Sequence, residues 1–376
     1  MTIQQIEFYE VVVPAHPDAI ASKTIDKPLH KLSVGAKDGW TVQFDQLPKL
    51  LIKISLRNGT VGWGECYRDH QWSMVEQISK IIIGQDIRNL SLQKLPFIFC
   101  REYDGFECAL YDVYAKAHDL RVVDLLGGPV QDKIHVGAWS SHRNKEDIPA
   151  LAKKFSDLGF DCIKFKTDLE DDVQAWCESI RQVDKNMQVI FDPNERWETS
   201  GHTRKRMHKL AEVGNVLCLE DPIPRWKLND YALLKAQGII PIVLHVSLPY
   251  IVHGQRIKDA IQALELNAVD GFNFNGGLAN FQRLDHISHA AGLPCWHGSE
   301  IDLGILEAMY LHSCSAAASC TWPGDIFGRL IREHDLLKKP LDIRPPFAYL
   351  PDGKGLGVEP DMDAVKHYQI NYRVIK

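Results

Sequence analysis

The first part of the chain alternates apolar and polar positions in short runs, and this pattern predicts β-strands. Residues 6–14 form one such run, and residues 50–68 form two more around Asn58-Gly59, a dipeptide typical of tight hairpin turns. Helical spacing of apolar residues follows over residues 72–83, 90–99 and 105–118. Strands followed by helices predict an α+β domain over residues 1–130.

A long polar connection separates the first predicted strand from the second. It runs from about Pro14 to Lys49 and contains few periodic apolar residues. A connection of this length in a compact protein is either disordered or functional, and the usual functional form is a lid. We therefore expect this lid segment to fold over the active site and to exclude water from it.

From Lys133 onward, short apolar runs alternate with amphipathic helical stretches. The runs predict strands at residues 134–139, 162–166, 189–194, 216–222, 241–246, 271–275 and 293–298, with an eighth at 319–323. Repeated strand–helix units predict parallel strands, and about eight of them in ~200 residues predict a closed barrel. An open doubly wound sheet is the alternative, but no GxGxxG motif follows the first strand.

The predicted fold class is therefore α/β, with a (β/α)7β-type barrel of the modified TIM type over residues 131–340. Residues 1–130 form a lid or capping domain beside it. The tail, from about residue 340 to residue 376, is expected to return to the capping domain.

Four predicted strand ends follow one another at a nearly constant spacing. Lys166, Asp192, Glu220 and Val246 are separated by 26, 28 and 26 residues. One strand–helix unit has about this length, so the four positions should be neighbours on one rim of the barrel. In such barrels the C-terminal rim carries the chemistry, because the loops that follow the strands converge there.

Composition and charge restrict the possible partners. The chain has 376 residues, 45% of them hydrophobic, which is enough for two domains, and nine cysteines without a CxxC pair. A net charge of −6 and a pI near 6.2 argue against a nucleic-acid or anionic-membrane partner. The first residues lack the pattern of a signal peptide, and no run approaches the ~18 apolar residues of a membrane span. Single cysteines are typical of buried thiols in a reducing cytoplasm, where we expect the protein to reside.

Lys164 and Lys166 lie two positions apart on an apolar strand. A period of two places both on one face, while Ile163 and Phe165 point the other way, toward the helices. Two neighbouring ammonium groups disfavour each other's protonation, and partial burial adds to this effect, which can turn a lysine into a general base. The alternative is a pair of solvated lysines at a frayed strand end.

Asp192 and Glu220 end the next two predicted strands, each after four or five apolar residues. A helix cap or a turn is the alternative role, although Asp221 already provides such a cap after Glu220. Two carboxylates one unit apart on the same rim predict a site for a hard cation, above all Mg²⁺ with waters as further ligands. Asn194, in the same turn as Asp192, is a candidate substrate-binding residue.

These motifs together resemble the enolase superfamily, in its mandelate racemase and muconate lactonising branch. Lys-Phe-Lys at 164–166, Asp-Pro-Asn at 192–194 and Leu-Glu-Asp-Pro at 219–222 carry the resemblance. Residues 106–128 resemble the last lid-domain helix of that branch, and residues 355–359 its closing segment. The resemblance covers nearly the whole chain. It implies a small carboxylate substrate chelated to Mg²⁺, removal of its α-proton by a base on the rim, an enediolate held by the metal and a lysine, and a homo-oligomer.

The sequence departs from the family pattern at two strand ends. The third metal ligand of the family, an acid, falls on Val246, and alternation should turn the adjacent His245 to the other face unless the strand has a bulge. At the sixth strand the family has a lysine or an aspartate, where this chain has Asn275, which is neither acid nor base. We expect weak Mg²⁺ binding, or a softer ion such as Mn²⁺ or Zn²⁺ if His245 becomes the third ligand.

His297, at the predicted seventh strand end, lies where racemase-like members of the branch hold a catalytic histidine. A hydrogen-bonded structural histidine is the alternative. Glu300 and Asp302 follow on the same loop and are candidates to orient it. Asp325, near the eighth strand, is a further candidate, with a structural role as its alternative.

Three functions fit these residues. The first is an isomerase or hydro-lyase in which Lys166 is the base, Lys164 its electrostatic partner and His297 the opposing acid. The polar set Asn194, Asn273, Asn275, His297 and Glu300 suits a polyhydroxylated acid. The second is a non-catalytic or altered-chemistry carboxylate-binding relative, as Val246 and Asn275 suggest. The third is an unrelated phosphate-handling barrel, which no glycine-rich turn after the last strands supports.

Overall fold

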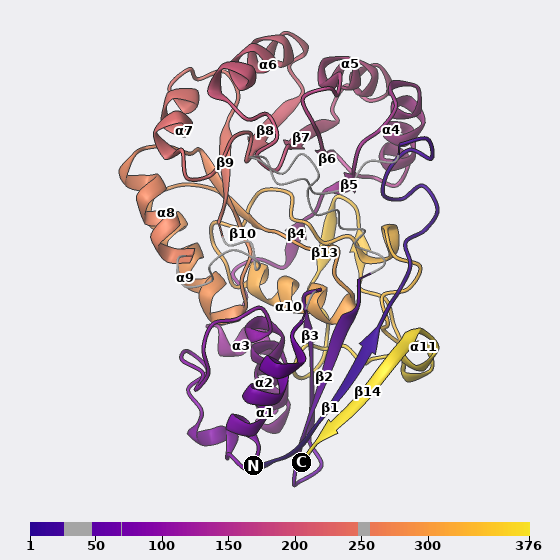
Figure 1. Ribbon diagram of the computed structural model, residues 1–376, viewed down its shortest axis with the longest axis vertical. Helices are drawn as coiled ribbons and strands as arrows, with labels where there is room; N and C mark the ends of the chain where they lie inside the picture. Colours follow the sequence, from indigo (N-terminus) through magenta and orange to yellow (C-terminus); the bar gives the residue numbers. More distant parts are fainter. Residues whose placement is uncertain (26–46, 69, 247–255) are drawn as a thin grey trace.

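The computed structural model describes residues 1–25, 47–68, 70–246 and 256–376. A capping domain with an antiparallel sheet lies beneath a larger barrel of parallel strands (Figure 1). The predicted α/β architecture, a barrel of the modified TIM type with an N-terminal α+β domain, is confirmed. All nine cysteines are free thiols. No helix in the described ranges is both long and apolar enough to cross a membrane.

The sheet of the capping domain joins the two ends of the chain. Its strand order is β14-β1-β2-β3, from β1 (Ile3–Val11), β2 (Lys49–Leu56), β3 (Val61–Cys66) and β14 (Gln369–Ile375). β14 pairs antiparallel with β1, so the tail returns to this domain.

Two helices, α1 (Trp72–Ile82) and α2 (Tyr103–Ala117), pack on this sheet. α2 approaches β3 closely because Gly64 has no side chain, and a Cβ there would overlap the Gly105 carbonyl. The helix predicted over residues 90–99 is absent: a short 3-10 turn, η2 (Ile87–Asn89), precedes irregular backbone. Pro96 explains the error, because proline lacks the N–H that a helix interior requires.

Seven parallel strands form the barrel wall in the order β11-β10-β9-β8-β7-β6-β5. They are β5 (Ala138–Ser140), β6 (Cys162–Lys166), β7 (Gln188–Asp192), β8 (Val216–Glu220), β9 (Ile242–Val246), β10 (Gly271–Phe274) and β11 (Cys295–His297). The covering helices are α4 (Ile148–Asp157), α5 (Val173–Val183), α6 (Ser200–Val213), α7 (Leu228–Lys235), α8 (Arg256–Glu265), α9 (Leu278–Ala290) and α10 (Gly304–Ser315).

Residues 319–325 close the barrel without forming a full strand. Cys320 makes a parallel bridge to Cys295 of β11, and Gly324 makes one to Val136, just before β5. The segment therefore supplies the eighth wall position, as predicted. The remaining short elements are α3 (Val122–Leu125), β4 (Lys133–His135), η3 (Lys145–Asp147), η5 (Gly328–Leu330), β12 (Ile343–Arg344), β13 (Phe347–Tyr349) and α11 (Met362–Tyr368).

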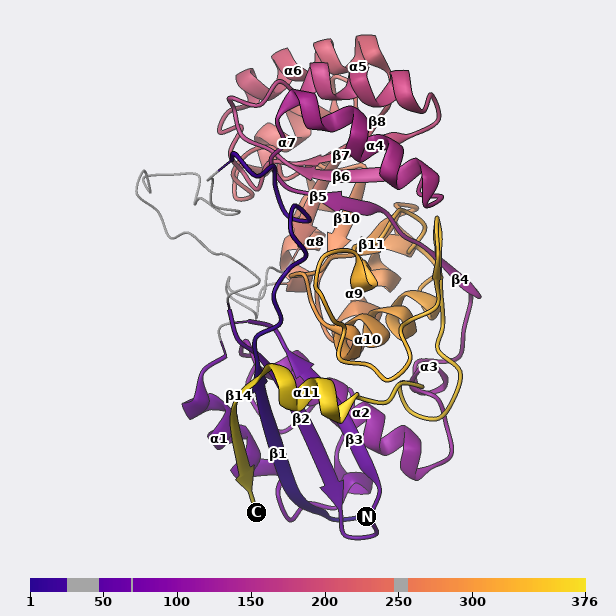
Figure 2. The ribbon, with the colours of Figure 1, turned by 90° about the vertical axis from the view of Figure 1, so that its right-hand side faces the viewer.

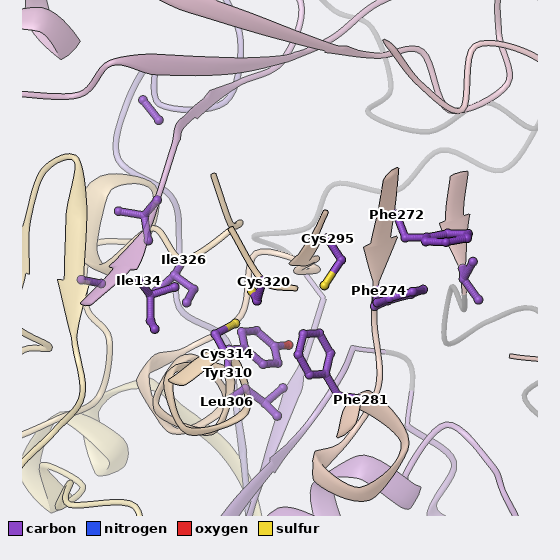
Figure 3. Close-up of a cluster of buried hydrophobic side chains, with 14 of the residues drawn as sticks. Ile134, Phe272, Phe274, Phe281, Cys295, Leu306, Tyr310, Cys314, Cys320 and Ile326 are labelled. Atoms are coloured by element: carbon purple, nitrogen blue, oxygen red, sulfur yellow. The ribbon is translucent and has the colours of Figure 1, made fainter. Parts of the chain in front are cut away.

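The two faces of the barrel strands differ in chemistry. The inner face carries a small apolar layer of Cys162, Ile190, Cys218, Val243 and Trp296. The outer face packs on the helices: Phe272 and Phe274 of β10 face the same layer as Phe281 of α9 and Tyr310 of α10 (Figure 3). Alternation along each strand thus decides whether a side chain meets the interior or the helices.

The described start of the lid segment lies beside the C-terminal end of β5. Ser22 N donates to His142 O, and the Arg143 guanidinium donates to Asp18 O and Ala19 O. Residues 14–25 therefore run from the capping domain along the barrel (Figure 2). Residues 26–46, which make up most of the predicted lid, lie outside the described residues.

Candidate active site

The C-terminal ends of β6, β7 and β8 bring the four predicted charged residues together inside the barrel. Lys164 Nζ lies 2.7 Å from Glu220 Oε2 and 3.5 Å from Asp192 Oδ2. Lys166 Nζ lies 2.5 Å from Asp192 Oδ2. Asp325, from the closing segment, completes the group, with Oδ2 at 2.8 Å from Lys164 Nζ. We call these five residues the strand-end cluster.

The electrostatics of Lys164 differ from the sequence-based expectation. Two adjacent lysines were expected to lower each other's pKa, but three carboxylates surround this ammonium group. Burial alone disfavours the charged form, yet Asp325, Glu220 and Asp192 raise the pKa of Lys164 well above its usual value. Lys164 is therefore a permanent positive charge, and the Trp296 ring, 5.6 Å from Nζ, lies beneath it.

The three acids of the cluster are not equivalent. Burial opposes ionisation of Glu220, but Lys164 and His245 hold its pKa well below the usual range. Burial raises the pKa of Asp325, and the nearby charge of Glu220 adds to the rise despite Lys164. Asp325 therefore accepts a proton more readily than Glu220 does.

The register predicted at β9 is wrong by one residue. Val246 packs in the outer core with Leu244, whereas His245 faces the interior. His245 Nδ1 lies 3.2 Å from Glu220 Oε1, and its Nε2 is hydrogen-bonded to Asn275 Oδ1. No bulge is needed, because simple alternation from Val243, which faces inward, brings His245 inward as well. His245, not Val246, ends the inner face of this strand.

The amides of β10 and of the β7 turn line the same interior. Asn273 Nδ2 donates to Glu220 Oε1 at 2.7 Å, and Gly298 leaves room for both β10 amides because a Cβ there would overlap them. Asn273 Oδ1, Asn275 Nδ2 and both side-chain atoms of Asn194 are buried without a hydrogen-bond partner. Buried polar atoms are normally paired, so these atoms mark where a polar ligand would bind.

His297 does not lie across the cluster from the lysines, so its predicted position is wrong. Its ring stacks between Phe281 and Tyr310, whose ring centroids lie 4.6 Å and 3.9 Å away, in the layer between the strands and the helices. Both ring nitrogens face backbone carbonyls, those of Gly298 and Gly276. Burial lowers the pKa of His297 to about 4. Alternation explains the error: Trp296 takes the inner face at β11 and turns its neighbour outward.

Glu300 and Asp302 contact the capping domain, and neither is hydrogen-bonded to His297. Glu300 Oε2 forms ion pairs with Arg68 at 3.1 Å and Arg101 at 2.8 Å. Asp302 pairs with Lys49 and accepts a hydrogen bond from Tyr310 at 2.6 Å. These acids join the two domains at the β11–α10 loop.

Lys49, Glu65 and Asp302 form a buried group at this domain boundary that sequence reasoning missed. We call it the junction triad. Lys49 Nζ lies 3.0 Å from Glu65 Oε1, and Glu65 also accepts from the first N–H groups of α10, at Leu303 and Leu306. The available signal was a charged residue inside an apolar strand pattern, at Lys49 in β2 and Glu65 in β3.

The cluster contains ligands suited to a divalent cation. Asp192, Glu220 and His245 end the inner faces of three neighbouring strands. Glu220 Oε2 faces Lys164 Nζ at 2.7 Å, and His245 Nδ1 faces Glu220 Oε1 at 3.2 Å. Carboxylates are common ligands of divalent metals, so Asp192 and Glu220 are the residues that would hold such an ion.

A second group of potential ligands lies after β5 and β6. His142, Asp168 and Asp171 each place one donor atom within 4.8 Å of the others. His142 Nδ1 is 2.9 Å from Asp171 Oδ2, and Arg196 forms an ion pair with Asp168.

Comparison with known proteins gives a consistent picture. The family described as Enolase C-terminal domain-like matches residues 147–364. A chloromuconate cycloisomerase from Pseudomonas sp. (strain P51) is 26% identical over 308 residues, which cover 77% of this chain and 80% of that protein. The structure of N-succinyl Arg/Lys racemase from Bacillus cereus ATCC 14579 has a TM-score of 0.82 at 19% identity and covers 100% of both chains. That of 2-chloromuconate cycloisomerase from Rhodococcus opacus 1CP has a TM-score of 0.82 at 21% identity, covering 99% of this chain and 100% of that one. The fold is shared along the whole chain.

Proposed function

Because the chain belongs to the enolase superfamily, in its mandelate racemase and muconate lactonising branch, we propose that it abstracts the α-proton of a small carboxylate. Lys166 is the base, and Lys164 is the fixed positive charge that stabilises the negative charge left on the substrate. The single observation that carries this proposal is the position of both ammonium groups among the strand-end carboxylates.

The hydrogen-bond partners of Lys166 and Lys164 suit these different roles. Lys166 has one counter-ion, Asp192, at 2.5 Å. A cation held by Asp192 would draw this carboxylate away from the Lys166 ammonium. Lys164 faces Asp325 and Glu220 as well and keeps its proton. Asp192 and Glu220 would hold a divalent cation such as Mg²⁺, which would supply positive charge for the substrate carboxylate.

The inner faces of β10 and β11 favour a reaction that uses one base. They present Asn273, Asn275 and Trp296 inward, and none of these side chains is an acid or a base. A two-base racemisation would need such a group opposite Lys166. Cycloisomerisation, or elimination of a β-hydroxyl from a hydroxy acid, requires proton removal on one side only. The unpaired amides of Asn194, Asn273 and Asn275 suit a hydroxylated substrate.

Exchange of the substrate α-proton with solvent tests the proposal. The protein is incubated in D₂O with Mg²⁺ or Mn²⁺ and a panel of hydroxylated and unsaturated carboxylates, and exchange is followed by proton NMR. We expect exchange with at least one acid and a loss of about 10²-fold or more in Lys166→Met. Lys338→Met, which changes an exposed lysine, is the matched control.

Binding without exchange would overturn the enzymatic proposal. If carboxylates bind by calorimetry but none exchanges its α-proton, the chain is the non-catalytic carboxylate-binding relative. The free thiols fit the cytoplasmic location that we propose, and assembly into a homo-oligomer stays a prediction.

A further inference from the structure

The loops after β5 and β6 hold a buried histidine between two acids, apart from the strand-end cluster. His142 follows β5, and Asp168 and Asp171 follow Lys166 of β6 by two and five residues. One donor atom of each of the three residues lies within 4.8 Å of the other two. Their side chains are at most 9% exposed. The proposed reaction uses none of them.

The hydrogen bonds of this imidazole ring leave one nitrogen unused. His142 Nδ1 lies 2.9 Å from Asp171 Oδ2, so a neutral ring has its proton on Nδ1 and a lone pair on Nε2. Nε2 is buried without a hydrogen-bond partner among the described residues, and the acid that it faces, Asp168 Oδ2, is 3.9 Å away. This separation is too long for a hydrogen bond. It fits two ligands of one ion, because each would lie about 2.1 Å from the metal.

Neighbouring groups hold both carboxylates in place. Asp171 Oδ2 also accepts the N–H of Asp168 at 2.7 Å, which fixes its contact with the ring. Arg196 pairs with Asp168 through Oδ1, whereas Oδ2 of the same carboxylate faces His142. These four side chains carry one more negative charge than positive when the ring is neutral, so a cation between them is attracted. A carboxylate bonded to the far nitrogen of the ring is the usual support of a metal-binding histidine.

We propose that His142, Asp168 and Asp171 form a second cation site, which takes a first-row transition ion such as Zn²⁺ through His142 Nε2. One imidazole and two carboxylates suit such an ion better than Mg²⁺, which prefers oxygen ligands throughout. Ser22 of the lid segment donates its N–H to His142 O, and Asp168 lies two residues after Lys166. The ion would therefore tie the loop on which the lid segment docks to the loop that follows the proposed base. The site does not depend on the proposed reaction.

The zinc content of the full-length protein tests the site. The protein is saturated with Zn²⁺, passed through a desalting column and analysed for metal, and His142→Gln is treated in the same way. We expect the parent to retain one ion more than His142→Gln, whatever Asp192 and Glu220 hold. His135→Gln is the matched control, because His135 pairs with a single acid, Asp161, at 2.7 Å, and its loss should leave the zinc content at the parental value.

Two further measurements guard against a variant that merely misfolds. Arg196→Gln removes the guanidinium that competes for Asp168, so calorimetry should show Zn²⁺ bound about tenfold more tightly than by the parent. Co²⁺ accepts the same ligands as zinc, and the proton NMR spectrum of the cobalt-loaded parent should contain a strongly shifted, solvent-exchangeable signal from His142 Nδ1–H. Equal zinc content in the parent and His142→Gln, or the same shifted signals in both, would overturn the inference and leave His142 as a structural link between two acids.

Discussion

Two groups of buried charge lie near the same rim of the barrel, and they differ in how completely their polar atoms are paired. In the junction triad each carboxylate oxygen accepts a hydrogen bond or an ion pair: Glu65 from Lys49, Leu303 and Leu306, and Asp302 from Lys49, Ser299, Glu300 and Tyr310. Such complete pairing offers nothing to a ligand.

The strand-end cluster and its neighbours leave several buried atoms without a partner. Asn273 Oδ1, Asn275 Nδ2 and both side-chain amide atoms of Asn194 belong to this set. Leaving such atoms unpaired costs stability, so their concentration at one place indicates a site that is completed by a ligand. The comparison teaches that buried charge alone does not identify an active site, whereas incomplete pairing does.

The largest expected effect concerns the junction triad. Lys49→Met removes the shared cation and leaves Glu65 and Asp302 buried side by side. Burial opposes ionisation of Asp302, and Lys49, helped by hydrogen bonds from Tyr310 and the Glu300 N–H, holds its pKa at about 2. We expect the free energy of unfolding to fall by about 3–5 kcal/mol in urea titrations. Lys338→Met removes one partner of an exposed ion pair and should leave the midpoint of urea unfolding unchanged. Equal midpoints for both variants would show that the triad contributes nothing to stability.

A smaller effect, with a defined pH dependence, is expected at His297, which is fully paired like the triad. Its folded-state pKa of about 4 lies below the free value near 6.5, so the unfolded chain binds more protons between these limits. Stability is therefore lost as the pH falls from 6.5 toward 4. Between pH 7 and pH 5 the parent should lose about 2 kcal/mol more than His297→Gln.

Urea unfolding of both proteins at the two pH values provides the measurement. Other buried groups, such as Glu307 and His312, are common to parent and variant and cancel in the difference. An identical pH dependence in the two proteins would mean that the ring of His297 titrates normally and is not held in the outer layer.

The smallest expected effect is on metal binding, which should differ between the strand-end cluster and the junction triad. The Lys164 ammonium and a divalent cation compete for Asp192 and Glu220. Lys164→Met should therefore bind Mn²⁺ about tenfold more tightly, or about 1.4 kcal/mol, by calorimetry. Lys49→Met should not acquire a metal site, because the triad carboxylates are held by backbone N–H groups. Weaker Mn²⁺ binding in Lys164→Met would show that the ammonium assists the cation instead of competing with it.

The barrel and the charged residues at the ends of β6, β7 and β8 could be predicted, because both depend on local periodicity. Alternation along β6 placed Lys164 and Lys166 correctly, and the unit length placed Asp192 and Glu220 on the same rim. These rules use neighbouring residues and one strand–helix repeat, which the sequence contains directly.

The errors arose where the repeat length varies. The next inner position after Glu220 is His245, 25 residues on, so the assumed 26-residue step selected the outward-facing Val246. A one-residue shift in a strand exchanges the two faces, and His297 was misplaced for the same reason. The junction triad joins residues more than 200 positions apart, and a single sequence has no rule for such pairs.

The pairing of β14 with β1 has a consequence for biosynthesis. More than 350 residues separate the two strands, so β1 is made long before its outer neighbour exists. At a synthesis rate of roughly 5–20 residues per second, this edge of β1 stays unpaired for tens of seconds while the chain is still on the ribosome. An unpaired edge strand readily joins other strands, so the nascent chain is exposed to mispairing throughout that interval. Chaperones that shield strand edges should therefore improve its yield more than those that act after release.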